Sequence, residues 1–345
     1  GINDIYGNME QNTIATQLTW LAEACLASAC TVARGELARF GRPTYVADGG
    51  EAGEAEFAII AMGKMGGYEL NYHSDLDIIY IYDRQGETDG SRRISNHEYF
   101  ARLGQKIISV LTTQSREGYV YKIDTRLRPS GNAGPLVTSL DSFRSYHREE
   151  AHIWERQALT KARVVYGGAV LAGNIDEVIR ETVYGSGADA AVRAEIHRLR
   201  MRMETEIARE SAGSYNIKTG RGGMVDVEFI VQYLQLVHGR DHGEIRSTNT
   251  VEALQAIREE GLLPAGYCDT LLNGYTCLRR LENRLRIIHD YSMNDLGGSS
   301  EYLNKLARRL GYDPKLRNAG EVMIRDYEEL TDAIRGVYSK ILGEG

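Results

Sequence analysis

The sequence predicts an α+β protein in which a mixed β-sheet flanked by helices is followed by a C-terminal helical bundle. Residues 57–83, FAIIAMGKMGGYELNYHSDLDIIYIYD, hold two apolar runs of strand length on either side of a glycine-rich turn. Beyond residue 139, apolar residues recur mainly at helical spacing. We therefore expect three parts: an N-terminal helix in residues 1–45, packed on a sheet-containing domain in residues 46–170, and a helical bundle in residues 171–345.

The first predicted element is a long helix over residues 13–40. Apolar side chains follow helical spacing along this segment, and Gly41 and Pro43 end it. The small and acidic residues 47–56 are typical of a loop, which leads into the first strand of the predicted sheet.

The later elements are mostly helical. Residues 96–111, 139–162 and 188–209 carry apolar residues at helical spacing. The arginines of the third segment lie between the apolar positions and are expected to form a solvated face: Arg193, Arg198, Arg200 and Arg202. The bundle is completed by helices expected at residues 224–237, 249–261, 265–291 and 320–342.

Composition and charge exclude several classes of protein. The net charge of −7 on 345 residues gives no electrostatic reason for non-specific nucleic-acid binding. No apolar stretch approaches the ~18 residues of a membrane span, and the amino end lacks a basic leader. The four cysteines show no metal or disulfide spacing and are expected to be buried free thiols. We expect a cytoplasmic protein whose partners include neither nucleic acid nor membrane.

The glycine-rich turn and the strand after it carry a candidate phosphate and metal site. Residues two apart on a strand share a face, about 7 Å apart, so Asp75 and Asp77 can direct both carboxylates at one divalent cation. A turn with little side-chain bulk and unpaired backbone N–H groups lets the main chain approach a polyphosphate closely. The turn residues that we expect there are Gly63, Lys64, Gly66 and Gly67.

A third carboxylate follows in residues 118–129, GYVYKIDTRLRP, which alternate as a strand. The charged face of this strand would present Asp124 together with Arg126 and Arg128. Asp124 can complete a carboxylate triad, and three carboxylates are a natural complement for two Mg²⁺ ions. The two guanidinium groups are suited to phosphate oxygens.

Each motif taken alone has a simpler structural interpretation. An Asp-x-Asp pair is usually a turn or cap motif, and a glycine cluster usually marks a plain turn. The glycine segment also lacks the order of a Walker loop and of a dinucleotide fingerprint. The order of strand, glycine turn, Ser-Asp-x-Asp strand and Asp-x-Arg-x-Arg-Pro strand favours a catalytic site.

Other cations are candidates for nucleotide contact. Lys161 and Arg163 follow a helical segment and can reach phosphates, although cations at helix ends commonly just complement the helix dipole. Lys218 and Arg221 lie in a glycine-rich entry to a helix, which is a type of segment that binds anions. We include Lys161 and Lys218 among the candidate nucleotide-binding residues.

Four blocks of the sequence resemble one known family. They are GKMGGYELNYHSDLDIIYIYD, YKIDTRLRPSGNAGPLVTS, WERQALTKARVVYG and NIKTGRGGMVDVEFIVQYLQL, and the resemblance runs from about residue 57 to residue 236. These blocks are similar to those of the bifunctional glutamine synthetase adenylyltransferase/adenylyl-removing enzyme, a member of the polymerase-β-like nucleotidyltransferase superfamily. The resemblance implies Mg²⁺-dependent transfer of AMP between ATP and a tyrosine hydroxyl of glutamine synthetase, or the phosphorolytic reversal.

This chemistry gives each candidate residue a role. Asp75 and Asp77 would ligate both Mg²⁺ ions, and Asp124 would bind the catalytic ion and receive the tyrosine proton. The triphosphate would lie in a cradle formed by Gly66, Gly67 and Ser74. Charge that develops on it would be balanced by Arg126 and Arg128.

The family joins two related catalytic halves, and this chain holds one copy of each motif, so we expect it to be a fragment. The segments at residues 128–134 and 150–159 resemble the adenylylating half, whereas Arg156 and Pro135 favour the adenylyl-removing half. We expect the C-terminal adenylyltransferase half, with phosphorolytic removal of AMP, giving ADP, as the alternative.

Two further expectations concern regulation of the enzyme and a non-enzymatic alternative. The resemblance implies control by a nitrogen-regulatory signal protein through the full-length enzyme, and we expect that control to be partly lost in a single half. A regulatory module that binds nucleotide without turnover is a non-enzymatic alternative. Three convergent carboxylates that repel one another without a metal argue against it.

Overall fold

A computed structural model describes Asp4 and residues 9–47, 49–185, 190–208, 210–211, 213–289 and 291–343. The chain divides into two compact units. We call the first the sheet unit, which comprises Asn12–Leu70 and Ser74–Ser186. The second, the helical unit, comprises Gly1–Gln11, Asn71–His73 and Gly187–Gly345.

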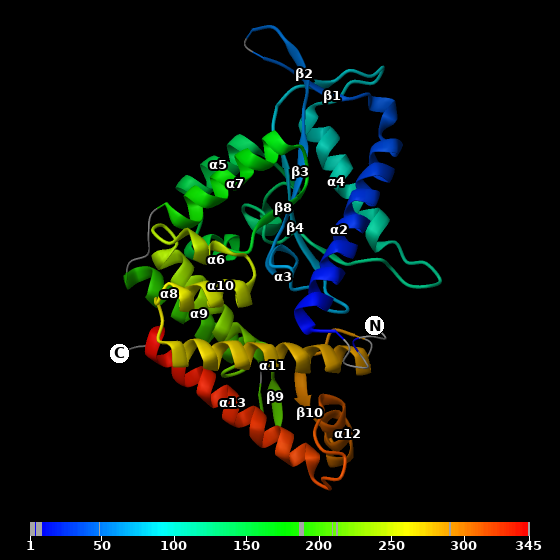
Figure 1. Cartoon of the computed structure of the whole chain (residues 1–345). Helices are drawn as coiled ribbons and strands as arrows, with labels where there is room; N and C mark the ends of the chain where they lie inside the picture. The colour runs from blue at the N-terminus through cyan, green and yellow to red at the C-terminus, as the bar shows by residue number, and fades with distance from the viewer. Residues whose placement is uncertain are drawn as a thin grey trace. The chain divides into compact units, whose positions relative to one another are not determined.

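The sheet unit is built on a five-stranded mixed sheet in the order β6-β4-β3-β8, with β7 also beside β4 (Figure 1). Strand β3 (Phe57–Ala61) runs antiparallel to β4 (Leu76–Tyr82) and to β8 (Arg163–Tyr166). Strands β6 (Ile123–Asp124) and β7 (Val137–Ser139) run parallel to β4. The mixed sheet with flanking helices, and so the predicted α+β class, is confirmed.

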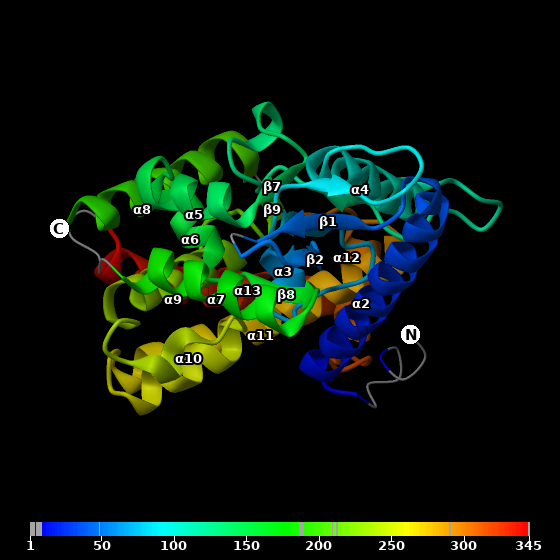
Figure 2. The same cartoon turned by 90° about the horizontal axis from the view of Figure 1, so that it is seen from above.

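Helices cover both faces of the two central strands. On one face, alternate residues of β3 and β4 pack with α2 (Gln11–Glu36) and α4 (Asn96–Thr112) in one apolar core. Phe57 stacks there on Tyr80 and Phe100, with ring centroids 5.5 and 5.6 Å apart. On the other face, α5 (Leu140–Glu149) contacts β4, and α7 (Ala169–Tyr184) contacts β3 (Figures 1 and 2). Both faces of β4 are therefore buried, and its one charged side chain, Asp77, lies near its first end.

Several short elements complete the sheet unit. Strand β1 (Pro43–Val46) pairs with β2 (Ala52–Glu54) and with β5 (Glu87–Thr88) in a small antiparallel sheet, so the loop expected at residues 47–56 contains a strand. The helix expected at residues 139–162 is divided into α5 and α6 (Ile153–Leu159). His152 precedes the first residue of α6 and caps it, and its N–H donates to the Glu155 carboxylate at 2.9 Å in a capping box.

The helical unit consists mainly of α-helices with one two-stranded ribbon. Helix α11 (Ala265–His289) packs against four other helices of this unit. These are α9 (Met224–His238), α10 (Thr250–Glu259), α12 (Ser300–Leu310) and α13 (Ala319–Ile341). The unit also holds α8 (Ala190–Met203) and the antiparallel strands β9 (Ser214–Asn216) and β10 (Asp295–Gly297). Helix α12 and the ribbon were not predicted, and residues 188, 189, 209 and 290 of predicted helices lie outside the described residues.

One expectation about α8 is wrong. Arg198 and Arg202 are solvent-exposed as expected, but the side chain of Arg200 is fully buried. Its guanidinium pairs with the buried carboxylate of Asp226 on α9 and donates to the carbonyl oxygen of Gly220 at 2.6 Å. A buried cation requires such a partner, and the sequence separates this pair by a loop that periodicity does not describe.

The predictions about membrane spans and about cysteines can both be compared with the structure. None of the helices formed by the described residues combines the length and apolarity needed to cross a membrane. All four cysteines are free, as expected. Cys30 and Cys268 are buried, whereas Cys277 is exposed, so the expectation of buried thiols is wrong for Cys277.

Candidate active site

The glycine turn places Gly63 directly beside the carboxylate of Asp77. After β3 the chain forms α3 (Gly63–Gly66), a single helical turn that Gly63 enters with φ +53°. A Cβ atom on Gly63 would lie 3.0 Å from Oδ2 of Asp77, and the N–H of Met62 donates to the Asp77 carbonyl at 2.9 Å. Only glycine satisfies both the positive φ and this close approach without strain.

The strand register places two of the predicted carboxylates side by side. Asp77 on β4 is the direct partner of Asp124 on the parallel strand β6. Paired residues on adjacent strands project to the same face, with the strands ~4.8 Å apart. Asp75 precedes β4 and is exposed. The structure thus brings together Gly63, Asp77 and Asp124 from the glycine turn and two neighbouring strands.

The strand predicted at residues 118–129 is wrong in extent, because only Ile123–Asp124 is β-strand. Gly118, the first residue of the predicted strand, has φ +102° and forms a turn with Ser115 instead of an extended segment. After Asp124 the chain turns, and the N–H of Arg128 donates to the Thr125 carbonyl at 3.2 Å. Strand alternation therefore does not place Arg126 and Arg128 on the face of Asp124.

Arg126 reaches Asp124 by this turn instead. Its backbone N–H donates to Oδ1 of Asp124 at 2.9 Å, and its guanidinium forms an ion pair with Oδ2 at 2.5 Å. These hydrogen bonds lower the pKa of Asp124. The pKa of Arg126 is raised chiefly by the hydrogen bond to Asp124, and also by the charges of Asp77 and Asp75. The Arg126 side chain is 74% exposed, so solvent screens this pair and the guanidinium can leave it at little cost.

Arg128 is buried and holds the loop after β6 together. Its guanidinium donates to the carbonyl oxygen of Thr125 at 2.7 Å, to that of Pro135 at 3.0 Å and to that of Gly134 at 3.3 Å. These carbonyls use its Nε, Nη1 and Nη2 groups, which favours a structural role. Phosphate binding by Arg128 stays a prediction.

Gly66 is required by packing of the chain around Lys161. A Cβ atom on Gly66 would lie 1.7 Å from the carbonyl oxygen of Lys161, so no side chain fits there. The Lys161 ammonium forms an ion pair with Glu69 at 2.5 Å, and both side chains are buried. Lys161 therefore fixes the glycine turn from outside, and its contact with nucleotide stays a prediction.

The expectation of unpaired backbone N–H groups fails at two glycines. The N–H of Gly66 donates to the Met62 carbonyl and that of Gly67 to the Gly63 carbonyl, both at 3.1 Å. Those amides complete the helical turn. The half-buried Lys64 and Ser74 also lie in the sheet unit, and their roles at the triphosphate stay predictions.

Lys218 belongs to the helical unit, on the loop between β9 and α9. Oδ1 of Asn216 accepts hydrogen bonds from the N–H groups of Lys218 at 3.2 Å and Thr219 at 2.9 Å, which shapes the loop. Gly222 has φ +70°, and its N–H donates to the buried Asp226 at 2.9 Å. The loop is thus fixed from within its own unit, and contact between Lys218 and nucleotide stays a prediction.

The carboxylates of Asp77 and Asp124 are chemically suited to bind a divalent cation. Carboxylate oxygens are the ligands that Mg²⁺ prefers, and the register of β4 and β6 brings Asp77 and Asp124 together. Nevertheless, within the described ranges no group of three or more Asp, Glu, His or Cys side chains is arranged to hold a metal ion. Both oxygens of Asp124 accept hydrogen bonds from Arg126. Cation binding at this pair therefore requires Arg126 to release Asp124.

Comparison with known proteins identifies the family. Residues 1–178 match the family model for glutamate-ammonia ligase adenylyltransferase. The chain belongs to this family. The resemblance seen in the sequence is thereby confirmed. Residues 190–342 match a second model, that of GlnD PII-uridylyltransferase.

Relatives of the adenylyltransferase family are similar over most of this chain. Three are named bifunctional glutamine synthetase adenylyltransferase/adenylyl-removing enzyme. The protein of Haemophilus ducreyi is 35% identical over 89% of this chain and 32% of its own length. Those of Thioalkalivibrio sulfidiphilus and Ralstonia nicotianae are 40% and 36% identical over 82% and 90% of this chain, and over 30% and 34% of their own lengths. The chain spans about a third of the length of these relatives.

Sequence reasoning missed a buried ionic cluster on α11 of this adenylyltransferase-family chain. Glu282 accepts hydrogen bonds from Arg279 at 3.1 Å, Arg286 at 2.8 Å and Asn71 at 3.2 Å, and Arg286 also donates to the Tyr72 carbonyl at 2.8 Å. All of these residues belong to the helical unit. The signal was present, because Arg279, Glu282 and Arg286 share one face of a helix with apolar neighbours.

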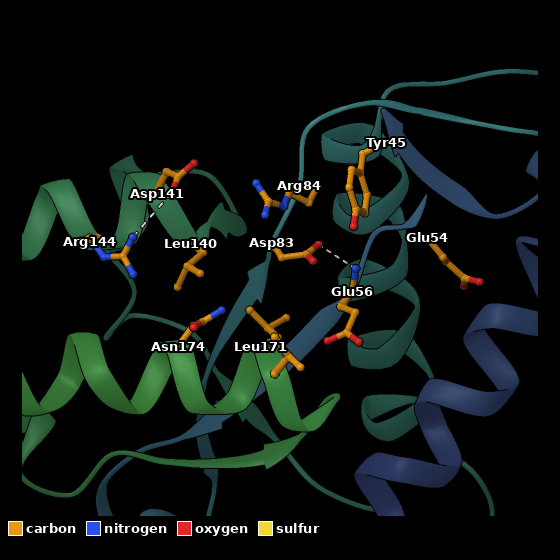
Figure 3. Close-up of a pocket in the computed structure, with 11 residues that line it drawn as sticks. Tyr45, Glu54, Glu56, Asp83, Arg84, Leu140, Asp141, Arg144, Leu171 and Asn174 are labelled. Carbon is orange, nitrogen blue, oxygen red and sulfur yellow. Dashed lines mark hydrogen bonds and ion pairs between the residues drawn. The ribbon is translucent and has the colours of Figure 1, made fainter. Parts of the chain in front are cut away.

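A pocket of about 520 Å³ lies at the opposite end of β4 from Asp77 (Figure 3). Asp83 and Arg84, which follow β4, line it together with Glu56, whose N–H donates to Asp83 at 2.7 Å. Burial raises the pKa of Asp83. No residue of the predicted site lines this pocket, so the pocket and the candidate active site are separate features of the sheet unit.

Proposed function

We propose that the sheet unit is a polymerase-β-like nucleotidyltransferase that transfers AMP from ATP to a tyrosine hydroxyl of glutamine synthetase. The observation that carries this proposal is the pairing of Asp77 with Asp124 across β4 and β6, with Gly63 against the Asp77 carboxylate. Membership of the glutamate-ammonia ligase adenylyltransferase family supports it. The names of the relatives indicate the class of acceptor protein.

The proposed reaction assigns metal binding and proton transfer to the three carboxylates, and close contact with the triphosphate to the glycine turn. Asp75, Asp77 and Asp124 would hold one or two Mg²⁺ ions, which supply Lewis-acid stabilisation of the charge on the phosphates. The tyrosine oxygen forms a bond to the α-phosphorus, the bond to pyrophosphate breaks, and the tyrosine proton passes to Asp124. The glycine turn lets the main chain approach the triphosphate closely at Gly63.

Arg126 would regulate access to the oxygens of Asp124. While the two are paired, both oxygens of Asp124 accept hydrogen bonds from Arg126, and the pKa of Asp124 is lowered. When the exposed guanidinium of Arg126 turns to a phosphate oxygen, the oxygens of Asp124 become available to a cation. One movement of Arg126 would then help to neutralise the substrate and free a metal ligand.

The alternative proposal is the removing reaction, in which phosphate attacks adenylyl-tyrosine and ADP leaves. The names of the relatives include both activities, and this chain spans about a third of their length. We prefer the transferase direction because the segments at residues 128–134 and 150–159 resemble that half. We further propose a cytoplasmic location, and control by a nitrogen-regulatory signal protein that acts through the full-length enzyme.

An assay in both directions tests the proposal. The chain is incubated with Mg²⁺, α-labelled ATP and unmodified glutamine synthetase, and separately with phosphate and labelled adenylyl-glutamine synthetase. We expect label in glutamine synthetase in the first reaction and little ADP in the second. Release of labelled ADP without transfer would assign the removing reaction, and tight binding of Mg²⁺-ATP without either reaction would favour a regulatory module.

A further inference from the structure

Arg163 on β8 is joined to the glycine turn by its side chain. Its Nε donates to the carbonyl oxygen of Gly66 at 3.2 Å, and its Nη2 donates to that of Met65 at 3.3 Å. These carbonyls lie at the C-terminal end of α3, and that of Met65 also accepts a hydrogen bond from the N–H of Tyr68 at 3.3 Å. A guanidinium at this end adds hydrogen bonds to them and complements the negative end of the turn.

Two other side chains fix the guanidinium itself. Nη2 of Arg163 forms an ion pair with Glu23 on α2 at 2.5 Å, and both side chains are about one-quarter exposed or less. The guanidinium carbon lies 3.8 Å from the centre of the Tyr68 ring. Tyr68 has φ +56°, a strained value for a non-glycine residue that persists only where surrounding contacts hold it. The three side chains belong to the sheet unit.

We propose that Arg163 is a positioning residue for nucleotide binding, and that it acts by holding the glycine turn rather than by touching phosphate. The inference rests on the proposed function for its link to nucleotide. Glu23 and Tyr68 are the residues that keep Arg163 in place. Helix α2 is thereby coupled to the turn that carries Gly63.

The physical reason is the small size of α3. Four residues are too few for a helical turn to be stable by itself, and two of the four are glycines. The turn is held by the Lys161 carbonyl packed on Gly66 and by the hydrogen bonds from Arg163. Loss of these hydrogen bonds would let the turn open and carry Gly63 away from Asp77. Lysine cannot replace the arginine, since it lacks both the fork of donors and the planar group that stacks on Tyr68.

Amide hydrogen exchange tests the positioning role without nucleotide. In Arg163→Met the amides of Gly67 and Glu69, which close the turn, are expected to exchange about tenfold faster than in the wild type. Glu23→Gln is expected to raise the same rates by a smaller factor. The matched control is Arg102→Met, because Arg102 also pairs with a glutamate, Glu98, and lies over an aromatic ring, Phe40. Unchanged exchange in Arg163→Met would overturn the inference.

Binding of Mg²⁺-ATP tests the functional part. We expect Arg163→Met and Arg163→Lys to raise the dissociation constant and the KM for ATP about tenfold, and Glu23→Gln to raise them less, with Arg102→Met unchanged. Weaker binding with unchanged exchange would show that Arg163 contacts phosphate directly, which contradicts the inference. Faster exchange with unchanged binding would contradict it also. Failure of the wild type to bind Mg²⁺-ATP would reject the proposed function, while the exchange result would still decide the positioning role.

Discussion

Replacement of Gly63 by alanine is a sharp perturbation of the candidate active site. Two costs follow from the structure. An alanine at φ +53° costs ~1–2 kcal/mol of stability, because the left-handed region is strained for residues with a Cβ atom. The new Cβ atom would lie 3.0 Å from Oδ2 of Asp77, so the carboxylate must rotate away. We expect the melting temperature to fall by ~2–8 °C and AMP transfer to fall by at least ~100-fold.

A second glycine separates strain from displacement of the carboxylate. Gly50 has φ +81°, and a Cβ atom there would meet no atom within 4 Å. Gly50→Ala should therefore lose ~1–2 kcal/mol of stability while AMP transfer is retained. The assay is the initial rate of label transfer from ATP to glutamine synthetase, alongside thermal melting of each variant. If Gly63→Ala kept a rate within about threefold of Gly50→Ala, the placement of Asp77 against the turn would have no functional consequence, and the reasoning would be refuted.

Three other predictions concern single side chains. Asp77→Asn should abolish transfer and leave metal-free melting unchanged or slightly higher, because it removes one charge from a repulsive cluster; near-normal turnover would contradict its assignment. Asp226→Asn should cost ~3 kcal/mol in urea unfolding because the buried Arg200 loses one of its two carboxylate partners and keeps only Glu204, at 3.3 Å, whereas Asp332→Asn, at an exposed pair, should cost less than ~1 kcal/mol. Burial lowers the pKa of His147 in the folded protein to about 4. Between pH 6.5 and pH 4 the imidazole is therefore protonated in the unfolded chain but mostly neutral in the folded one, which favours unfolding. Stability should fall by ~2 kcal/mol between pH 7 and pH 5, and His147→Leu should remove that fall in denaturant titrations at the two pH values.

Periodicity predicted the sheet and most helices because their patterns are local. The strands β3 and β4 are apolar on both faces, and α4 carries its core residues at regular helical spacing. The strand expected around Asp124 was too long because a turn begins at Thr125. That turn is stabilised by hydrogen bonds from Arg128 to carbonyls up to seven residues away, which alternation does not describe.

The candidate site was predicted in its residue types but not in its contacts. Alternation on one strand suggested the Asp75 and Asp77 pair, whereas the register adds Asp124 from a neighbouring strand. The pairing of Arg126 with Asp124 depends on a turn, and the burial of Lys161 depends on Glu69, which lies 92 residues earlier. The first contact depends on a local turn and the second on tertiary structure, and spacing along a strand describes neither, so the sequence assigned these cations to phosphate.

Calorimetric titration with Mg²⁺-ATP tests the central claim most directly, namely that the paired carboxylates of β4 and β6 bind the metal–nucleotide complex. The wild type is compared with Asp124→Asn, and with Glu98→Gln as a control whose carboxylate pairs with Arg102 on α4, away from the site. We predict saturable binding by the wild type and by Glu98→Gln, and at least tenfold weaker binding by Asp124→Asn. Equal affinity of all three proteins for Mg²⁺-ATP would contradict the account.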